Sequence, residues 1–81
     1  MMKAGKTTSG VMNIMDHSGH KQLHWNVEEL EDIAVARKTF DKLVSRGYSA
    51  FGSRENEPKH LIRDFDPTMK EVVMVPVTVG G

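Results

Sequence analysis

The chain has 81 residues, with eleven basic and eleven acidic side chains, no cysteine, and a formal net charge of zero. A chain of this length forms one small domain, and without cysteine it has neither a disulfide framework nor a thiolate ligand or nucleophile. The balanced, dispersed charge argues against a nucleic-acid-binding module, which normally carries a basic surplus on one face. No apolar run approaches the roughly 20 residues of a membrane span, and the N-terminus lacks the apolar core of a signal peptide. We therefore expect a soluble, cytoplasmic protein that binds neither nucleic acid nor membrane.

The chain begins with a polar stretch of small residues, 1–10, which we predict to be a flexible arm. Residues 11–16 and 21–27 then alternate between apolar and polar side chains, and Trp25 lies on the apolar face of the second run as a core anchor. A Ser-Gly turn in residues 17–20 separates the two runs. Two alternating runs on either side of a short loop with glycine predict a β-hairpin.

One amphipathic helix is predicted over residues 28–46, and Gly47 is expected to close it because glycine adopts the left-handed C-terminal conformation at no steric cost. Asn26 followed by Glu29 has the spacing of a capping box at the other end. Apolar residues recur at three- and four-residue spacing, which puts them on one buried stripe. This stripe comprises Leu30, Ile33, Ala36, Phe40, Leu43 and Val44.

Two short strands are predicted after the helix, at residues 48–51 and 60–65, with the polar loop 52–59 between them. We expect these strands at an edge of the sheet, where unpaired N–H and C=O groups are free to bind a partner chain. The side chains that could add an apolar patch to this partner surface are Tyr48, Phe51 and Leu61.

The last predicted strand covers residues 70–75, after a turn at 66–68. Its unbroken apolar row, 72–75, indicates a strand that is covered on both faces and is therefore central in its sheet. Pro76 cannot donate a ladder hydrogen bond and should end the strand. We expect residues 77–81 to project from the domain as a tail.

The order of hairpin, helix, two short strands and central strand predicts an α+β domain over residues 11–76, and this order is that of the β-grasp or ubiquitin-like fold. Residues 71–81 resemble the last strand and tail of the sulfur-carrier proteins of molybdopterin and thiamine synthesis. In that family an acidic residue and an apolar strand lead through proline and small or aliphatic residues to a terminal Gly-Gly. The segment also resembles ubiquitin, more loosely.

The resemblance implies a ubiquitin-like modifier or sulfur carrier, which other enzymes use as a substrate. By it, Gly81, preceded by Gly80, would be adenylated by an activating enzyme and would then carry a thiocarboxylate or an isopeptide bond. The implied partners are this adenylating enzyme and an acceptor protein or sulfur donor. The residues by which the enzyme would recognise the tail are Pro76, Val77, Thr78 and Val79.

Other functions remain open on the same residues. Gly80-Gly81 can be an ordinary flexible end, and the chain can be a non-catalytic interaction or structural protein of a phage or another large assembly. The histidines at 17, 20 and 24 suggest a metal site, but no acid or thiol is placed to complete four ligands, so we expect none. The chain has no Ser-His-Asp spacing, phosphate-binding loop or paired carboxylates. We therefore expect no enzyme activity and no cofactor.

Overall fold

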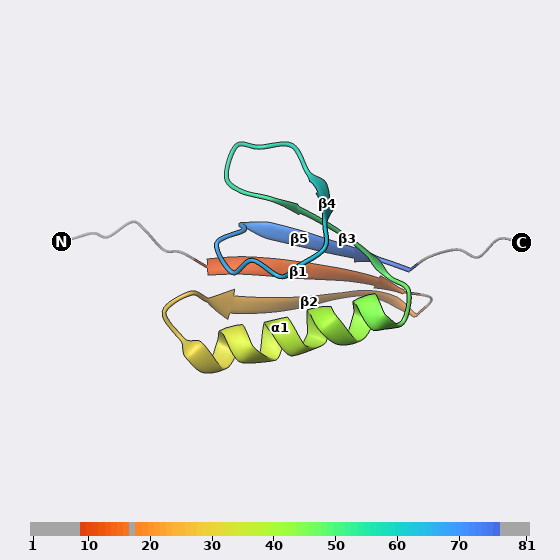
Figure 1. Ribbon diagram of the computed structural model, residues 1–81, viewed down its shortest axis with the longest axis horizontal. Coiled ribbons are helices and arrows are strands. Elements are labelled where there is room, and N and C mark those ends of the chain that lie inside the picture. Colours follow the sequence, from red (N-terminus) through yellow and green to blue (C-terminus); the bar gives the residue numbers. More distant parts are fainter. Residues whose placement is uncertain (1–8, 17, 77–81) are drawn as a thin grey trace, which may run out of the picture.

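The structure, a computed structural model, describes residues 9–16 and 18–76. It is a small α+β domain in which one helix packs on a five-stranded mixed sheet (Figure 1). The strand order across the sheet is β2-β1-β5-β3-β4; β1 and β5 are parallel, and the other neighbours are antiparallel. The elements are β1 (Ser9–Asp16), β2 (Gly19–Asn26), α1 (Leu30–Ser45), β3 (Ser49–Ser53), β4 (His60–Ile62) and β5 (Glu71–Val75).

The predicted hairpin is confirmed. Each strand begins two residues earlier than expected, at Ser9 and at Gly19, and β2 ends at Asn26 instead of residue 27. Pairing reaches Asp16 and Gly19, so the turn is shorter than residues 17–20. Asp16 Oδ1 accepts hydrogen bonds from the Ser18 hydroxyl (2.8 Å) and backbone N–H (2.9 Å). The hydroxyl bond is the main reason that the pKa of Asp16 is lowered.

The predicted boundary of the N-terminal arm at residue 10 is wrong, because Ser9 and Gly10 belong to β1. Gly10 pairs with Trp25 and is buried. A Cβ atom on Gly10 would lie 2.3 Å from Cζ2 of the indole ring, so only glycine fits there without a shift. Gly10, whose small size suggested a flexible arm, is thus the residue against which the Trp25 indole packs. Residues 1–8 lie outside the described part of the chain.

Helix α1 begins later than predicted, because Asn26 and Glu29 do not form a capping box. Glu29 is the N-cap residue, and it makes no side-chain capping hydrogen bond. Asn26 Oδ1 instead accepts from the backbone N–H of Glu28 at 2.8 Å, in a turn that ends β2. The backbone N–H of Asn26 donates to Asp32 Oδ2 at 3.2 Å. The asparagine therefore joins the strand to the helix without capping it.

The predicted end of α1 at Gly47 is confirmed. Gly47 has a φ of +98°, in the region that favours glycine. Its N–H donates to the Val44 carbonyl oxygen (2.9 Å), and the N–H of Tyr48 donates to that of Leu43 (3.0 Å). This pair of bonds is the Schellman motif, which satisfies carbonyl groups that the helix leaves without partners.

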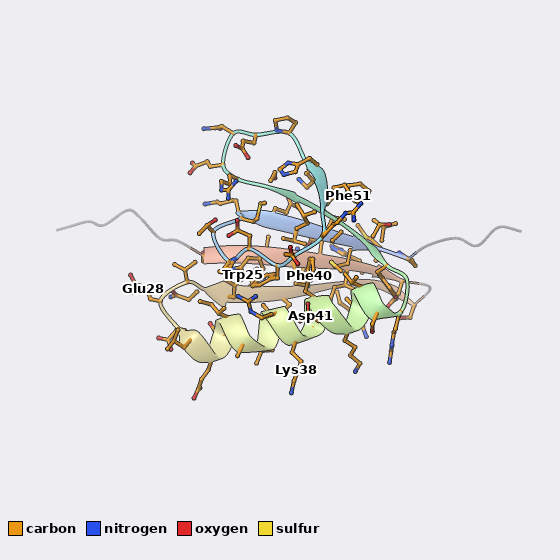
Figure 2. All side chains as sticks on the ribbon, in the orientation of Figure 1. Trp25, Glu28, Lys38, Phe40, Asp41 and Phe51 are labelled. Carbon is orange, nitrogen blue, oxygen red and sulfur yellow. The ribbon has the colours of Figure 1, made fainter. Side chains whose placement is uncertain are left out.

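The core lies between α1 and one face of the sheet, and Phe40 points from α1 into it (Figure 2). Ala36 and Leu43 are buried beside Phe40, as the stripe predicts. Leu30 and Val44 were wrongly included, since they are 81% and 38% exposed. Leu30 precedes Phe40 by ten residues, which at about 100° per residue leaves it roughly 80° away from the buried direction. The sheet and its loops contribute Met12, Trp25, Ala50, Phe65, Met69, Val72 and Met74.

Strand β4 ends at Ile62 instead of residue 65, because Phe65 leaves the strand to fill the core. The ring of Phe65 meets Trp25 edge-on with centroids 5.0 Å apart, and it lies 5.8 Å from Phe40. Trp25 Nε1 donates to the carbonyl oxygen of Pro67 at 3.0 Å, which gives the buried indole N–H the partner that it needs. The loop before β5 thus closes the core above the hairpin.

The predicted turn at residues 66–68 is confirmed. The N–H of Met69 donates to the Asp66 carbonyl oxygen at 3.0 Å. Asp66 Oδ1 accepts from the Thr68 hydroxyl (2.6 Å) and N–H (2.9 Å), while Oδ2 pairs with Arg54 Nη2 at 2.7 Å. These bonds, the Thr68 hydroxyl first, lower the pKa of Asp66.

The central position of β5 is confirmed, since it lies between β1 and β3. The inference that both of its faces are covered is wrong, because Val75 is 37% exposed and Val73 is only half-buried. β3 covers Ser49–Ser53 instead of residues 48–51, and it lies between β5 and β4. The expectation that β3 is an edge strand is therefore also wrong: the two edges are β2 and β4.

Replacing Phe40 by alanine should lower the free energy of unfolding by about 3–5 kcal/mol, because it removes the largest side chain that α1 buries. Lys38→Ala is the matched control, since Lys38 points away from the sheet (Figure 2), and should change it by less than about 0.5 kcal/mol. Urea denaturation measures both. Equal effects would contradict the packing of α1 through this face.

Candidate functional site: the open face of the sheet

Helix α1 covers one face of the sheet, and we call the other the open face. Successive side chains of a strand point to opposite faces, so the residues between the core positions belong to it. They are His20, Gln22 and His24 of β2, Val11, Asn13 and Met15 of β1, Glu71, Val73 and Val75 of β5, Ser49, Phe51 and Ser53 of β3, and Leu61 of β4.

One part of the open face is apolar. Phe51 pairs with both Val73 and Leu61, so these three side chains form one row across β5, β3 and β4. Val75 follows Val73 on the same face of β5, and Met15 lies on the neighbouring β1. Leu61, Met15 and Val75 are 56%, 39% and 37% exposed. We call these five residues the apolar patch.

The other part of the open face is a hydrogen-bonded polar network centred on Asn13, which is only 8% exposed. Asn13 Nδ2 donates to Glu71 Oε2 at 2.7 Å, and Asn13 Oδ1 accepts from Gln22 Nε2 at 2.9 Å. Nε2 of His20 lies 3.0 Å from the same oxygen. Lys59 Nζ pairs with Glu71 Oε1 at 2.7 Å. The network links β2, β1, β5 and the loop before β4, and it holds the polar half of the face in one arrangement.

Two of the three predicted partner-surface residues come together. Phe51 and Leu61 are register partners on the open face. Tyr48 lies on the other side of the sheet and packs against the core, so its inclusion in this surface is wrong. Pro76 follows β5 directly. The remaining predicted tail and conjugation residues, 77–81, lie outside the described residues.

The chemically active side chains of the described residues are dispersed. His20 and His24 lie on the open face, and His17 is outside the described residues. Within 9–16 and 18–76, no group of three or more metal-ligating side chains is close enough to hold a metal ion. Asp16 and Asp66, whose pKa values are lowered, belong to two different turns. No helix in the same ranges is long and apolar enough to cross a membrane.

The polar network at the centre of this face could not be predicted from the sequence. Asn13 and Glu71 are 58 positions apart, and only the parallel pairing of β1 with β5 brings them together. Strand alternation placed Asn13 on the polar face of its strand, but it carries no information on which residue lies opposite. Val73 and Val75 were read as core residues because the apolar row of β5 has no polar interruption.

In comparisons with protein-family models, curated proteins and solved structures, nothing matches the chain.

Asn13→Ala should lower the free energy of unfolding by about 1–3 kcal/mol, because it leaves Glu71 and Gln22 without the amide that they share in a largely buried position. Gln22→Ala removes one exposed member of the network and should cost less than about 0.5 kcal/mol. Thermal and urea unfolding of the two variants measure the difference. Similar values would mean that Asn13 does not organise the network.

Proposed function

We propose that this chain is a β-grasp domain that serves as a protein-binding module, with the open face as its binding surface. The β-grasp assignment is supported by the strand order β2-β1-β5-β3-β4 and by the parallel pairing of the first strand with the last. A single helix follows the first hairpin and packs on one face of the sheet. Folds of this kind host many activities, so the binding function rests on the surface itself.

The observation that carries the proposal is the apolar patch beside a fixed polar network. Protein interfaces typically have an apolar centre surrounded by polar groups, and a few central side chains supply most of the binding energy. Here Leu61 is the most exposed member of the patch, and hydrogen bonds of the Asn13 network fix the polar side chains beside it. The binding surface is therefore largely preorganised, which lowers the entropic cost of association.

Two basic residues lie on either side of β4, and both are exposed: Lys59, which is already paired with Glu71, and Arg63. We infer a protein partner that presents two or three apolar side chains to the patch. Standard interfaces bury about 800 Å² on each side, so the patch would form the centre of a larger contact.

A photoreactive amino acid at position 61 tests this proposal in the native host. It should give one discrete cross-linked partner, whereas the same amino acid at position 30 should give none. Leu30 is the matched control because it is 81% exposed and lies on α1, away from the open face. With the partner purified, Leu61→Glu should weaken binding at least about tenfold and Leu30→Glu should not. Cross-linking at both positions or at neither would contradict the proposal.

The same strand order favours a second candidate, a ubiquitin-like modifier or sulfur carrier. In a chain that ends at Gly81, a partner enzyme would adenylate the terminal carboxylate, which a sulfur donor or an amine would then attack. Glycines suit such a tail because a backbone without side chains can enter a narrow channel. The carrier reading is compatible with the first proposal, since the activating enzyme would be one partner of the open face.

Intact mass spectrometry of the untagged protein from its native host tests the carrier candidate. The expected result is a fraction with one oxygen replaced by sulfur, or a fraction joined through Gly81 to lysines of other proteins. Deletion of Gly80 and Gly81 should remove this fraction and leave the melting temperature unchanged. An unmodified mass under all growth conditions, with the partner of position 61 still cross-linked, would reject the carrier and retain the binding module.

A further inference from the structure

The middle of β2 has a free backbone edge. The N–H of Val11 donates to the carbonyl oxygen of Lys70 at 3.1 Å, on the β5 side of β1, so it does not bond to β2. In an antiparallel pair, two opposite residues exchange both hydrogen bonds or neither, and the two kinds of pair alternate. His24 is opposite Val11, so the N–H and C=O groups of His20, Gln22 and His24 point away from the sheet. Within the described residues these groups have no backbone partner.

The end of this edge is closed by α1. The outward N–H of Asn26 donates to Asp32 Oδ2 (3.2 Å), and its carbonyl oxygen accepts from the N–H of Glu29 (2.9 Å). The free groups are therefore confined to residues 20–24, the middle of an eight-residue strand. The opposite edge strand, β4, has only three residues. β2 is thus the edge that can accept another strand.

The flank of α1 beside this edge is acidic near the start of the helix and basic near its end. The bond to Asn26 places Asp32 on this flank, and residues three and four positions apart are neighbours on a helix surface. The same flank therefore continues through Val35 and Thr39 to Lys42 and Arg46. Val35 in its middle is 54% exposed. The acidic residues near the start of α1 are Glu28, Glu29, Glu31 and Asp32.

We propose that the free edge of β2 binds β2 of a second copy of this chain, antiparallel, so that the two sheets join into one. A two-fold axis at this edge makes the two α1 helices antiparallel on the same face. The acidic start of each helix then lies beside the basic end of the other. A surface with one sign of charge at each end complements itself under this symmetry, and this complementarity favours a second copy over an unrelated strand.

The strand edge and the helix flank agree on the position of the axis. The midpoint between Asp32 and Lys42 is residue 37, roughly 7.5 Å along α1 from Asp32. Asp32 is bonded to Asn26, and the same distance along β2 is two to three residues at about 3.3 Å each. The corresponding point on β2, counted back from Asn26, is Leu23 or His24. An axis at Leu23 lets Gln22 of each copy exchange both hydrogen bonds with His24 of the other.

The inference does not rest on the proposed function. The dimer uses the β2 edge and one flank of α1, whereas the apolar patch lies over β1, β5, β3 and β4. Both copies of the open face remain free, on the same side of the joined sheet. A failure of the dimer therefore leaves the binding module intact, and a failure of the binding module leaves the dimer intact.

Sedimentation equilibrium of the full chain tests the proposal, with an expected concentration-dependent species of twice the 9.1 kDa monomer mass. His24→Pro should abolish it, since proline removes an outward N–H without loss of a bond within the hairpin. The matched control His24→Ala keeps this N–H and should still dimerise. A chain that remains monomeric at about 1 mM, a concentration on the order of the dissociation constant of a weak specific complex, would overturn the proposal. A dimer that persists in His24→Pro would also overturn it.

Two further variants keep the test valid if proline disturbs the fold. The chain has no native cysteine, so Leu23→Cys should oxidise to a disulfide dimer, because Leu23 would face its own copy with Cα atoms about 4.5 Å apart. Arg37→Cys is the control, because Arg37 lies over the Phe65 ring on the other flank of α1, and it should remain monomeric on non-reducing gels. The double variant Lys42→Glu/Arg46→Glu should weaken dimerisation about tenfold, and adding Glu28→Lys/Glu31→Lys should restore it. Equal cross-linking of the two cysteines, or no rescue, would overturn this geometry.

Discussion

The structure depends on the insertion of β5 between β1 and β3. The hairpin β1–β2 and the pair β3–β4 form between neighbours in the sequence, but only β5 joins them into one sheet. Its Val72 and Met74 are fully buried in the core, and Val73 pairs with Phe51 in the row across the open face. Because β5 lies some 55 residues after β1, this step carries most of the loop-closure cost of folding. Core, polar network and apolar patch all form when it is complete.

The pleat of β5 lets one short strand supply both surfaces. Side chains at alternate positions enter the core, while Glu71, Val73 and Val75 face the other way. Glu71 supports the polar network through Asn13 and Lys59, and the two valines extend the apolar patch. The open face thus carries the apolar patch beside the polar network.

Periodicity predicted the elements well, and failed where a residue's role depends on a distant neighbour. The hairpin, the end of the helix at Gly47 and the central position of β5 follow from local pattern and glycine geometry. Gly10 looked like part of a flexible arm because the indole of Trp25, which requires it, is 15 positions away. Leu30 fitted the three- and four-residue spacing, yet its rotation around α1 carries it away from the sheet. The Asn13 network could not be predicted because register across parallel strands is set by the whole sheet.

The two sheet edges differ in how well they are protected from pairing with another chain, and this difference determines which edge can form the proposed dimer. β4 is short and lies between Lys59 and Arg63, a combination that discourages pairing with other chains. β2 has a closed end at Asn26, but the outward backbone groups of residues 20–24 have no backbone partner among the described residues. A domain that joins copies through this one edge stops at two, because the other edge does not propagate the sheet. Two joined copies present two apolar patches on one face, and a partner with two matching sites gains affinity from their linkage without any new contact.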